Sequence, residues 1–515
     1  MGLCYLLTLY GFVRGLDDPH PRRWFVVAWL ACLGGMASKE VMVSAPVMVF
    51  LFDRTFAGGS FRAAWTQRGR VHLALASTWL LLLALVVSTG GNRGGTVGAG
   101  VGISWGAYWL TQFRALPHYL ELSFWPSPLI FEYGAFWETG FAAVSGHAAL
   151  IAGLVAATLY ALWRRPAWGF CGAWFFAILA PTSLMAGTTQ MIVEHRMYLP
   201  LAAVTVVAVM AIHSQLGRRG VAVCYGAAAV FAILAGQRNS LYRSEAALWA
   251  DTLAKRPQNP RALDYYALAL MNQGRAADAV RYFEAALRIH SASPSSHEGL
   301  GTALFQLGRY AEARAHFETA LARKPNSATL ENSLAAACFR SGDFPAAAAH
   351  WQAALQADPT DLPVRRSLAA ALLRANRVTD ALEQYQEALR QDPRDGFAHN
   401  GFGVALLAAG RSAEGLTQLE EATRLLPELS DVHEDLANAL AAAARVREAI
   451  PVYETALRLN PQSAELHYRL GIACANTGRP AEAMEHLRTS VRIAPDHIDA
   501  RFSLFYQIRL KPDVS

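Results

Sequence analysis

The strongest constraint on the fold is a repeat. From residue 260 the sequence returns to one pattern every 34 residues without an insertion. A small residue recurs at Ala267, Gly301, Ala335, Ala369, Gly403, Ala437 and Gly471. A second small register contains Ala279, Ala313, Ala347, Ala381, Gly415, Ala449 and Ala483, and a large side chain follows it at Phe283, Phe317, Trp351, Tyr385, Leu419, Tyr453 and Leu487. Prolines at 325, 359, 393, 427, 461 and 495 close the units. The pattern predicts antiparallel helix pairs, because small residues allow close approach, a large one fills the gap and proline ends the second helix.

This pattern resembles the tetratricopeptide repeat (TPR), which has the same period. We expect seven repeats over residues 260–497 and a closing helix with a tail over residues 498–515. Trp249 and Pro257 fit the large and proline registers, so residues 237–259 are expected to form a linking half-repeat. The predicted fold class is therefore all-α, with a TPR α-solenoid after a different N-terminal region.

The N-terminal region, residues 1–236, contains apolar segments at about 1–13, 24–37, 41–52, 71–89, 145–163, 167–181, 199–213 and 220–236. These predict a polytopic transmembrane helical bundle. The first segment is shorter than the roughly 20 residues of a spanning helix, so we expect it to be a truncated helix and the chain to be a fragment or to begin at an internal start. The stretch 103–126 is rich in aromatic residues but broken by Arg114, Pro117 and Glu121, which favours a helix lying in the headgroup zone.

The charges indicate both orientation and partner class. Residues 1–236 contain 15 Lys and Arg against 8 Asp and Glu, whereas residues 237–515 contain 31 against 32. A near-neutral repeat region does not favour a nucleic-acid partner. Within the apolar region, eleven arginines follow alternate segments and the intervening loops hold four basic residues. By the positive-inside rule, loops 38–40, 90–144 and 182–198 and everything after residue 236 lie outside the cytoplasm. We expect an inner-membrane protein with extracytoplasmic repeats.

Segments 24–37 and 41–52 leave one alternative open. They could form a single long helix through "SKE", which would place Arg22 and Arg23 on the opposite face from the arginines at 54–70. A hairpin keeps these arginines on one face and is preferred.

Polar residues at the predicted outer face suggest a binding site. Lys39, the only lysine before residue 237, is followed by Glu40, and "TTQMIVEHRMYLPL" contains Glu194, His195, Arg196 and Tyr198. The guanidinium of Arg196 suits a phosphate, and Glu194 could orient it or accept sugar hydroxyls. The alternatives are a Lys39–Glu40 turn at the interface and a loop held by a Glu–Arg pair with Tyr198 as an anchor.

The stretches "MASKEVMVSAPVMVFLFDR", "YWLTQFRALPHYLELSFWPSPLIFEYG" and "EHRMYLPL", followed by repeats, resemble the transmembrane-and-TPR protein O-mannosyltransferases and their bacterial relatives. This resemblance implies a GT-C fold, a polyprenyl- or dolichyl-phosphate sugar as donor and extracytoplasmic repeats. Lys39 and Glu40 match the family's Ser-Lys-Glu turn, and Glu194 and Tyr198 match its Glu-Arg-x-x-Tyr-Leu-Pro stretch. His195 stands where animal members have Arg. The family's catalytic acid lies in a loop that would precede residue 1, so no catalytic residue is assigned.

Two functions follow from these observations. The first is a membrane glycosyltransferase that moves a mannose-like sugar from a polyprenyl-phosphate donor to hydroxyls of exported proteins, with the repeats presenting the acceptor. The alternative is a non-catalytic membrane-anchored TPR scaffold at the cell envelope. In either, Asn332, Asn400, Asn438, Phe305 and Phe339 are candidates for lining a peptide-binding groove.

Metal and redox chemistry are not expected. The six cysteines form no CxxC or Cys/His cluster, so no disulfide or zinc site is assigned. His297, His399, His433 and His467 share one repeat register, but equivalent residues of a solenoid lie too far apart for one ion to contact several of them. Their recurrence is expected to reflect duplication of a helix-face residue.

Overall fold

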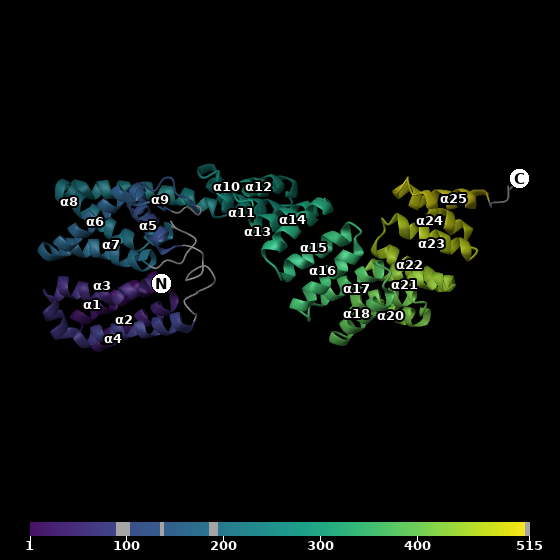
Figure 1. The fold of residues 1–515 in the computed structure, drawn as a ribbon, viewed down its shortest axis with the longest axis horizontal. Helices are drawn as coiled ribbons and strands as arrows, with labels where there is room; N and C mark the ends of the chain where they lie inside the picture. The colour runs from purple at the N-terminus through teal and green to yellow at the C-terminus, as the bar shows by residue number, and fades with distance from the viewer. Residues whose placement is uncertain (89–103, 134–137, 185–193, 510–515) are drawn as a thin grey trace. The chain divides into compact units, whose positions relative to one another are not determined.

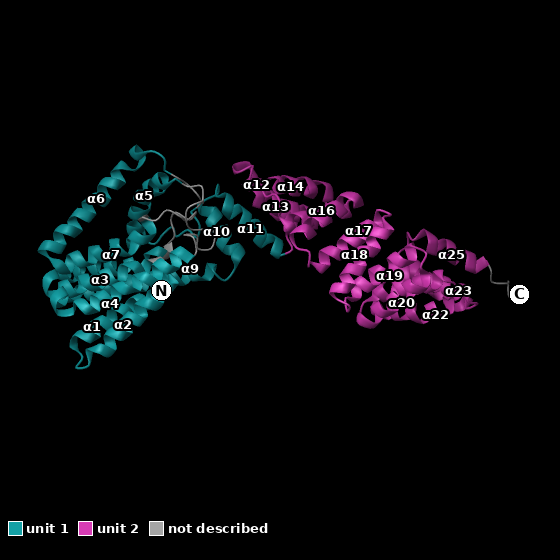
Figure 2. Cartoon of the chain, turned by 60° about the horizontal axis from the view of Figure 1, so that its bottom comes forward, with its two compact units in different colours: residues 1–273 teal, residues 274–515 magenta. Residues whose placement is uncertain are grey.

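The computed structural model describes residues 1–88, 104–133, 138–184 and 194–509, and these ranges contain helices and no strand (Figure 1). The chain divides into two compact units, residues 1–273 and 274–515 (Figure 2). This boundary falls between the two helices of the first predicted repeat. The predicted division into residues 1–236, 237–259, 260–497 and 498–515 remains a prediction.

Unit 1 consists of α1 (Gly2–Asp17), α2 (Pro21–Ser38), the 3-10 turn η1 (Glu40–Ser44), α3 (Ala45–Phe52), the π turn η2 (Asp53–Ala57), α4 (Phe61–Ser88), α5 (Trp105–Phe124), α6 (Phe141–Arg164), α7 (Pro166–Leu184), the 3-10 turn η3 (Glu194–Met197), α8 (Pro200–Leu216), α9 (Arg218–Leu241), α10 (Glu245–Lys255) and α11 (Pro260–Asn272). Each apolar segment of the sequence lies in one or more of these helices, except that Met1 and Leu199 directly precede α1 and α8 and residue 89 is outside the described residues.

Lys39 separates two helices. α2 ends at Ser38, Lys39 has extended backbone angles (φ −164°, ψ 145°), and η1 begins at the next residue. Segments 24–37 and 41–52 therefore do not form one continuous helix. The side of a membrane on which this turn lies remains a prediction.

The core of unit 1 joins α1, α2, η1, α3, α4, α5 and α7. Tyr5 and Phe12 of α1 are among its largest fully buried side chains. α1 and α2 pack closely because Gly11 faces the backbone of α2. A Cβ at Gly11 would lie 3.0 Å from both the carbonyl oxygen of Trp24 and the amide nitrogen of Ala28.

Three helices of the described residues, α4, α6 and α9, are long and apolar enough to cross a membrane. Much of their apolar surface faces outward, as at Leu80 and Ile233, which are 68% and 62% exposed. Exposing apolar surface to water costs about 25 cal/mol per Å², so helices of this kind favour an apolar surrounding. Three helices give limited support to the predicted polytopic bundle.

A buried ionic network connects η2 and α4. Asp53 is fully buried, and Arg68 donates two hydrogen bonds to its carboxylate, at 2.9 and 2.6 Å. His72 Nε2 lies 2.8 Å from the same carboxylate. The helix is interrupted at Arg68 (φ −133°, ψ 21°), next to this contact. Three ionisable groups share one site, so the energy of each depends on the other two.

Unit 1 ends in a junction built from α10 and α11. Trp249 of α10 stacks on Tyr265 of α11, with ring centroids 4.8 Å apart. Lys255 Nζ donates to Asp251 at 2.7 Å and to the carbonyl oxygen of Leu129 at 2.7 Å. The segment predicted as a linking half-repeat therefore packs against the chain that follows α5.

Unit 2 consists of α12 (Ala276–Ile289), α13 (Pro294–Gln306), α14 (Tyr310–Arg323), α15 (Ala328–Arg340), α16 (Phe344–Ala357), α17 (Leu362–Arg374), α18 (Val378–Gln391), α19 (Gly396–Ala408), α20 (Ser412–Leu425), α21 (Ser430–Ala442), α22 (Val446–Leu459), α23 (Ala464–Asn476), α24 (Pro480–Ile493) and α25 (Ile498–Arg509). The odd-numbered helices from α13 to α25 begin at intervals of 34 residues. They are the first helices of the successive repeats, and α25 is the expected closing helix.

The predicted registers form the core of unit 2. Phe317 and Leu419 of the large register are buried, as are Ala335 and Ala369 of the small register. A Cβ at Gly301 would lie 2.7 Å from the ring of Phe317, so this contact requires the small residue. Helix pairs at a fixed spacing follow from this packing.

In the turn between the two helices of each repeat, one residue has a left-handed backbone conformation. Gly274, Gly308, Gly342, Asn376, Gly410, Ala444 and Gly478 occupy the same repeat position, and all have positive φ. Glycine adopts this conformation without steric cost, whereas an alanine Cβ crowds the following carbonyl oxygen. Ala444 (φ 61°) is therefore the strained member of the series.

We predict that Ala444→Gly stabilises unit 2 by about 1 kcal/mol, because it removes the left-handed strain at an exposed position without removing a packed side chain. The measurement is denaturant unfolding of the whole chain in detergent, followed by circular dichroism. Gly410→Ala, the reverse change at the same repeat position, should lower stability. Equal effects of the two substitutions would contradict this explanation.

We predict that Asp53→Asn lowers the free energy of unfolding of unit 1 by about 3 kcal/mol, because it leaves Arg68 and His72 without their carboxylate. Thermal unfolding of the detergent-solubilised protein measures the loss. Asp17→Asn, at an exposed carboxylate of α1, is the matched control and should leave the unfolding temperature unchanged.

Candidate partner-binding face and a polar cluster in unit 1

The predicted polar residues of unit 1 lie in two short segments. Lys39 is half-buried between α2 and η1. Arg196 is half-buried in η3, and Tyr198, just after η3, is 72% exposed. The side chains of Glu40, Glu194 and His195 lie outside the described residues.

Two buried side chains connect these segments. The hydroxyl of Tyr5 lies 3.0 Å from Oγ of Ser44 in η1, and its ring meets that of Trp174 edge-on at 5.5 Å. Trp174 Nε1 donates a 2.8 Å hydrogen bond to the carbonyl oxygen of Leu199, beside Tyr198. The turn after Lys39 and the turn after Arg196 are therefore joined through the same pair of side chains. Whether Lys39 and Arg196 face one cavity remains a prediction.

The sequence did not reveal that Arg196 interacts with Tyr108 of α5. Thr182 bonds the same tyrosine, and two further buried polar residues lie near these positions in the chain, Gln112 and Ser183. The hydroxyl of Tyr108 donates to the carbonyl oxygen of Thr182 and also interacts with the guanidinium of Arg196. Gln112 follows Tyr108 by one helical turn and is 4% exposed, but neither polar atom of its amide has a hydrogen-bond partner among the described residues. Within the same described ranges, Oγ of buried Ser183 also lacks a partner. Burying such groups costs free energy unless something binds them.

The first helices of unit 2 form an ordered layer, because α17 contacts α19 and α19 contacts α21. Polar contacts cross this layer at a fixed offset. Asn400 Nδ2 donates to Asp435 at 2.7 Å, and one repeat later Glu434 lies 3.8 Å from Arg469. We call this surface the first-helix face and define it by Arg366, Phe397, Asn400, Asp431, Glu434, Asp435, Glu465 and Arg469.

The first-helix face is predominantly acidic toward its C-terminal end. Burial raises the pKa of both Glu434 and Asp435, and neighbouring carboxylates add to this effect. Arg469 acts in the opposite direction on Glu434. At the other end, Arg366 bonds both carboxylate oxygens of Asp395 at 2.7 Å and covers the ring of Phe397, which is 53% exposed. The face thus combines an exposed aromatic ring with carboxylates that a cation would stabilise.

The five residues predicted to line a groove all have partners within the array. Trp351 Nε1 donates to Asn332 Oδ1 at 2.7 Å, and the hydroxyl of Tyr453 donates to Asn438 Oδ1 at 2.7 Å. These asparagines therefore satisfy the polar atoms of the large register. Ring contacts link Phe305 to Tyr310, and Phe339 to Phe344 and Trp351. Asn400 contacts Asp435, as described above. Peptide binding by these five residues remains a prediction.

The histidine register is bonded locally. Nε2 of His297 donates to the carbonyl oxygen of Ser291, and Nε2 of His399 and His433 to those of Pro393 and Pro427, at 3.0 to 3.1 Å. The backbone of Pro461 interacts with His467, and this contact acts to raise the pKa of the imidazole. Among the described residues, no group of three or more His, Cys, Asp or Glu side chains is arranged to hold a metal ion.

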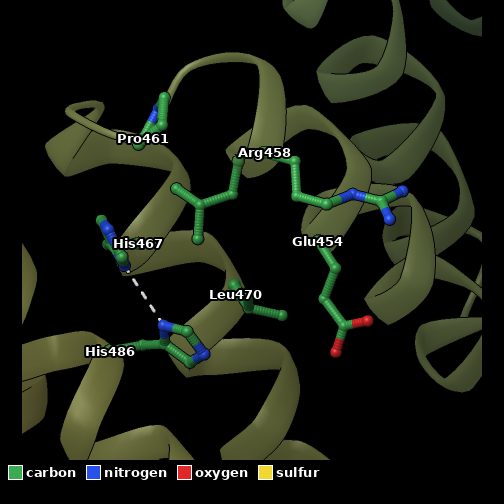
Figure 3. A pocket seen from close by; sticks show the side chains of 7 residues that line it. Glu454, Arg458, Pro461, His467, Leu470 and His486 are labelled. Carbon is green, nitrogen blue, oxygen red and sulfur yellow. Dashed lines mark hydrogen bonds between the residues drawn. The ribbon is translucent and has the colours of Figure 1, made fainter.

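A cavity of about 520 Å³ opens beside His467 (Figure 3). Residues of α22, α23 and α24 and the turn before α23 line it: Glu454, Leu457, Arg458, Pro461, His467, Leu470 and His486. The imidazoles of His467 and His486 face each other at its edge, with their Nδ1 atoms 3.1 Å apart.

Family models match the repeat region. Residues 299–361 and 434–498 match one model of the tetratricopeptide repeat, and residues 339–402 match another. Unit 2 is a tetratricopeptide array. Residues 239–320 also match the model for subunit 3 of the anaphase-promoting complex, or cyclosome. These models match residues 239–402 and 434–498 and leave the resemblance of residues 1–236 to the O-mannosyltransferases a prediction.

Solved structures with similar repeats include a tetratricopeptide repeat protein from Parabacteroides merdae, with 15% identity, 48% of this chain and 98% of that chain covered, and a TM-score of 0.43. A thermophilic TPR protein of Thermus thermophilus has 22% identity, covers 36% of this chain and 100% of that chain, and has a TM-score of 0.32. YrrB, described as a TPR protein with an unusual peptide-binding site, has 20% identity, 36% and 96% coverage and a TM-score of 0.29. No curated protein matches the chain in sequence.

We predict that Gln112→Leu raises the unfolding temperature of unit 1, because it replaces a buried, unpartnered amide by an apolar side chain of similar size. The free energy of unfolding should rise by about 1–3 kcal/mol. Thermal unfolding in detergent measures it. Gln384→Leu is the matched control, since its amide oxygen accepts a 3.1 Å hydrogen bond from Arg365, and it should bring no gain. A loss of stability in Gln112→Leu would show that the amide has a partner in solution.

Proposed function

We propose that this protein is a membrane-anchored scaffold whose TPR array binds a segment of a partner protein on the first-helix face. The observation that carries the proposal is the array itself. Stacked helix pairs present a long, regular surface built from their first helices, and such surfaces are used for protein recognition. The apolar helices α4, α6 and α9 support the anchoring role.

The chemistry of the first-helix face indicates the kind of partner. Asp431, Glu434, Asp435 and Glu465 outnumber the single Arg469 at the C-terminal end of the face. Because burial and mutual repulsion raise the pKa of Glu434 and Asp435, a cation placed against them gains more than it would on an open surface. Phe397 offers an apolar contact a repeat earlier. The partner segment is expected to be basic, with an apolar side chain beside its basic residues.

The placement of the array follows from the arginine distribution of residues 1–236. Positive residues favour the cytoplasmic side, so the loops with fewer of them and the array lie outside the cytoplasm. The partner is accordingly an envelope or exported protein. Cysteines placed in the array should react with an impermeant reagent on intact cells, and reaction only after lysis would contradict this placement.

We predict that a photo-crosslinking residue in place of Phe397 yields partner adducts in intact cells, whereas one in place of the exposed Gln352 on the second helix α16 does not. The adducts are counted by mass spectrometry of the purified chain. Glu434→Lys combined with Asp435→Lys should reduce the Phe397 adducts at least tenfold, because it places like charges opposite a basic segment. Equal adduct yields from both positions, insensitive to the charge reversal, would exclude the first-helix face.

A second candidate function is transfer of a sugar from a polyprenyl-phosphate donor to exported proteins. It is favoured by one observation, the contact between Tyr108 and Arg196. The buried polar side chains of Gln112 and Ser183 lie one helical turn after Tyr108 and directly after its partner Thr182 in the chain. A guanidinium with nearby hydrogen-bonding groups suits a phosphate that carries a sugar. In this function Lys39 and Arg196 bind the phosphate.

We predict for this second function that Lys39→Ala and Arg196→Ala each abolish incorporation of hexose from a labelled polyprenyl-phosphate hexose. The assay uses membranes that contain the protein, and protein level is checked by immunoblot. Arg62→Ala, at an arginine expected on the cytoplasmic side, is the control. Incorporation that is absent from the unmodified protein, or unchanged in both variants, would leave the scaffold as the function.

A further inference from the structure

We propose that the histidine pairs His297–His316 and His467–His486 are binding sites for a divalent transition-metal ion of the kind that imidazole prefers, such as Zn²⁺ or Cu²⁺. Each site lies within one repeat and joins its first helix to its second. The proposal goes beyond the scaffold function and does not depend on it.

The geometry of each pair fits one ion. The two Nδ1 atoms lie 3.0 Å apart in His297–His316 and 3.1 Å apart in His467–His486. Zinc binds imidazole nitrogen at about 2.0–2.1 Å in a tetrahedral arrangement, which places two ligand nitrogens about 3.3 Å apart. A shift of a few tenths of an ångström in the side chains would admit the ion.

The proton positions also fit. Nε2 of His297 faces the carbonyl oxygen of Ser291, and a carbonyl can only accept, so Nε2 donates and Nδ1 presents its lone pair to His316. The backbone of Pro461 also interacts with the imidazole of His467. A carbonyl that accepts from the far ring nitrogen is the arrangement that usually fixes a metal-binding histidine. In the metal-free pair, His316 or His486 donates the shared proton.

Metal binding moves this proton without removing it from the protein. The second imidazole changes tautomer, its proton passes to Nε2 through solvent, and both Nδ1 lone pairs then bind the ion. Burial lowers the pKa of His316, His467 and His486, and the facing imidazole lowers those of His316 and His467 further. Glu312 acts in the opposite direction on His316, as do Glu454, Glu482 and Glu485 on His486. Metal binding requires the neutral form of each imidazole, and a lowered pKa favours that form.

The second pair has space for further ligands. The cavity of about 520 Å³ beside His467 and His486 admits water or one small donor to complete the coordination. Glu454 lines the same cavity (Figure 3). With two protein ligands, each site is open and binds more weakly than a closed four-ligand site.

The other repeats supply the contrast. In the next repeat, the positions equivalent to His297 and His316 hold Glu331 and His350, and Oε2 of the glutamate lies 2.8 Å from Nδ1 of the histidine. In another repeat they hold His399 and Gln418, whose Nδ1 and Oε1 atoms lie 2.7 Å apart. The fold therefore accepts several different pairs of polar side chains at these two positions. Two repeats carry two imidazoles there.

The test is calorimetric titration of the detergent-solubilised whole chain with ZnCl₂, and separately with CuCl₂, in metal-free buffer at pH 7.5. Two ions should bind per chain. His316→Gln and His486→Gln should each remove one, and the double variant both. His399→Gln should remove none. Glutamine is the appropriate replacement, because the His399–Gln418 pair shows that a repeat keeps its hydrogen bond with this combination.

Copper supplies an independent readout, since nitrogen coupling in the electron paramagnetic resonance spectrum reports imidazole ligands. Two coupled nitrogens per ion are expected, with loss of one signal component in each single variant. Binding that is absent, or whose stoichiometry and spectrum are unchanged in the double variant, would overturn the proposal. Partner crosslinking at Phe397 is measured on the same variants and should be unaffected, which separates this test from that of the scaffold function.

Discussion

Unit 2 depends on one contact repeated along the chain, between a small residue on the first helix of a repeat and a large side chain on the second. Gly301 and Phe317 show why the two residues depend on each other, because the ring of Phe317 occupies the space that a Cβ at residue 301 would need. Each contact is local, within about twenty residues of sequence, and the array grows by adding it again. The outward residues of the first helices take no part in this contact, and the exposed ring of Phe397 and the carboxylates of α21 lie among them.

Local repetition is also why so much of this unit could be predicted. The 34-residue registers predicted helix pairs, and the structure places helices at that spacing. The left-handed turn residue was missed, although five of its seven positions are glycine. A glycine register at the seventh residue after the small register was available as a signal. Contacts between repeats were less predictable: the Asn400–Asp435 bond joins residues 35 apart, and nothing in either residue alone indicates the other.

In unit 1 the helices could be predicted from the sequence, but the contacts between them could not. Apolar runs predicted its helices because helix formation in such segments is dictated locally. The network of Asp53, Arg68 and His72 and the cluster around Tyr108 depend on which helices meet, and a single sequence does not contain that information. The predicted polar residues divide accordingly. Lys39 and Arg196 lie in turns that share Tyr5 and Trp174. Arg196 also contacts Tyr108 of α5, and although Tyr108 begins one of the stretches that carry the resemblance, the sequence did not connect these two residues.

The junction between the regions has a practical consequence. Sequence periodicity would place the cut for a soluble version of the repeats at residue 260. However, α11 belongs to the compact unit that precedes it: Tyr265 stacks on Trp249, and Asn259 Nδ2 donates a 3.0 Å hydrogen bond to the carbonyl oxygen of Glu132. Truncation at residue 260 would remove these contacts of α11. It would expose the ring face of Tyr265 that stacks on Trp249, and this would favour self-association. Expression beginning at residue 274 removes α11 altogether and avoids that surface.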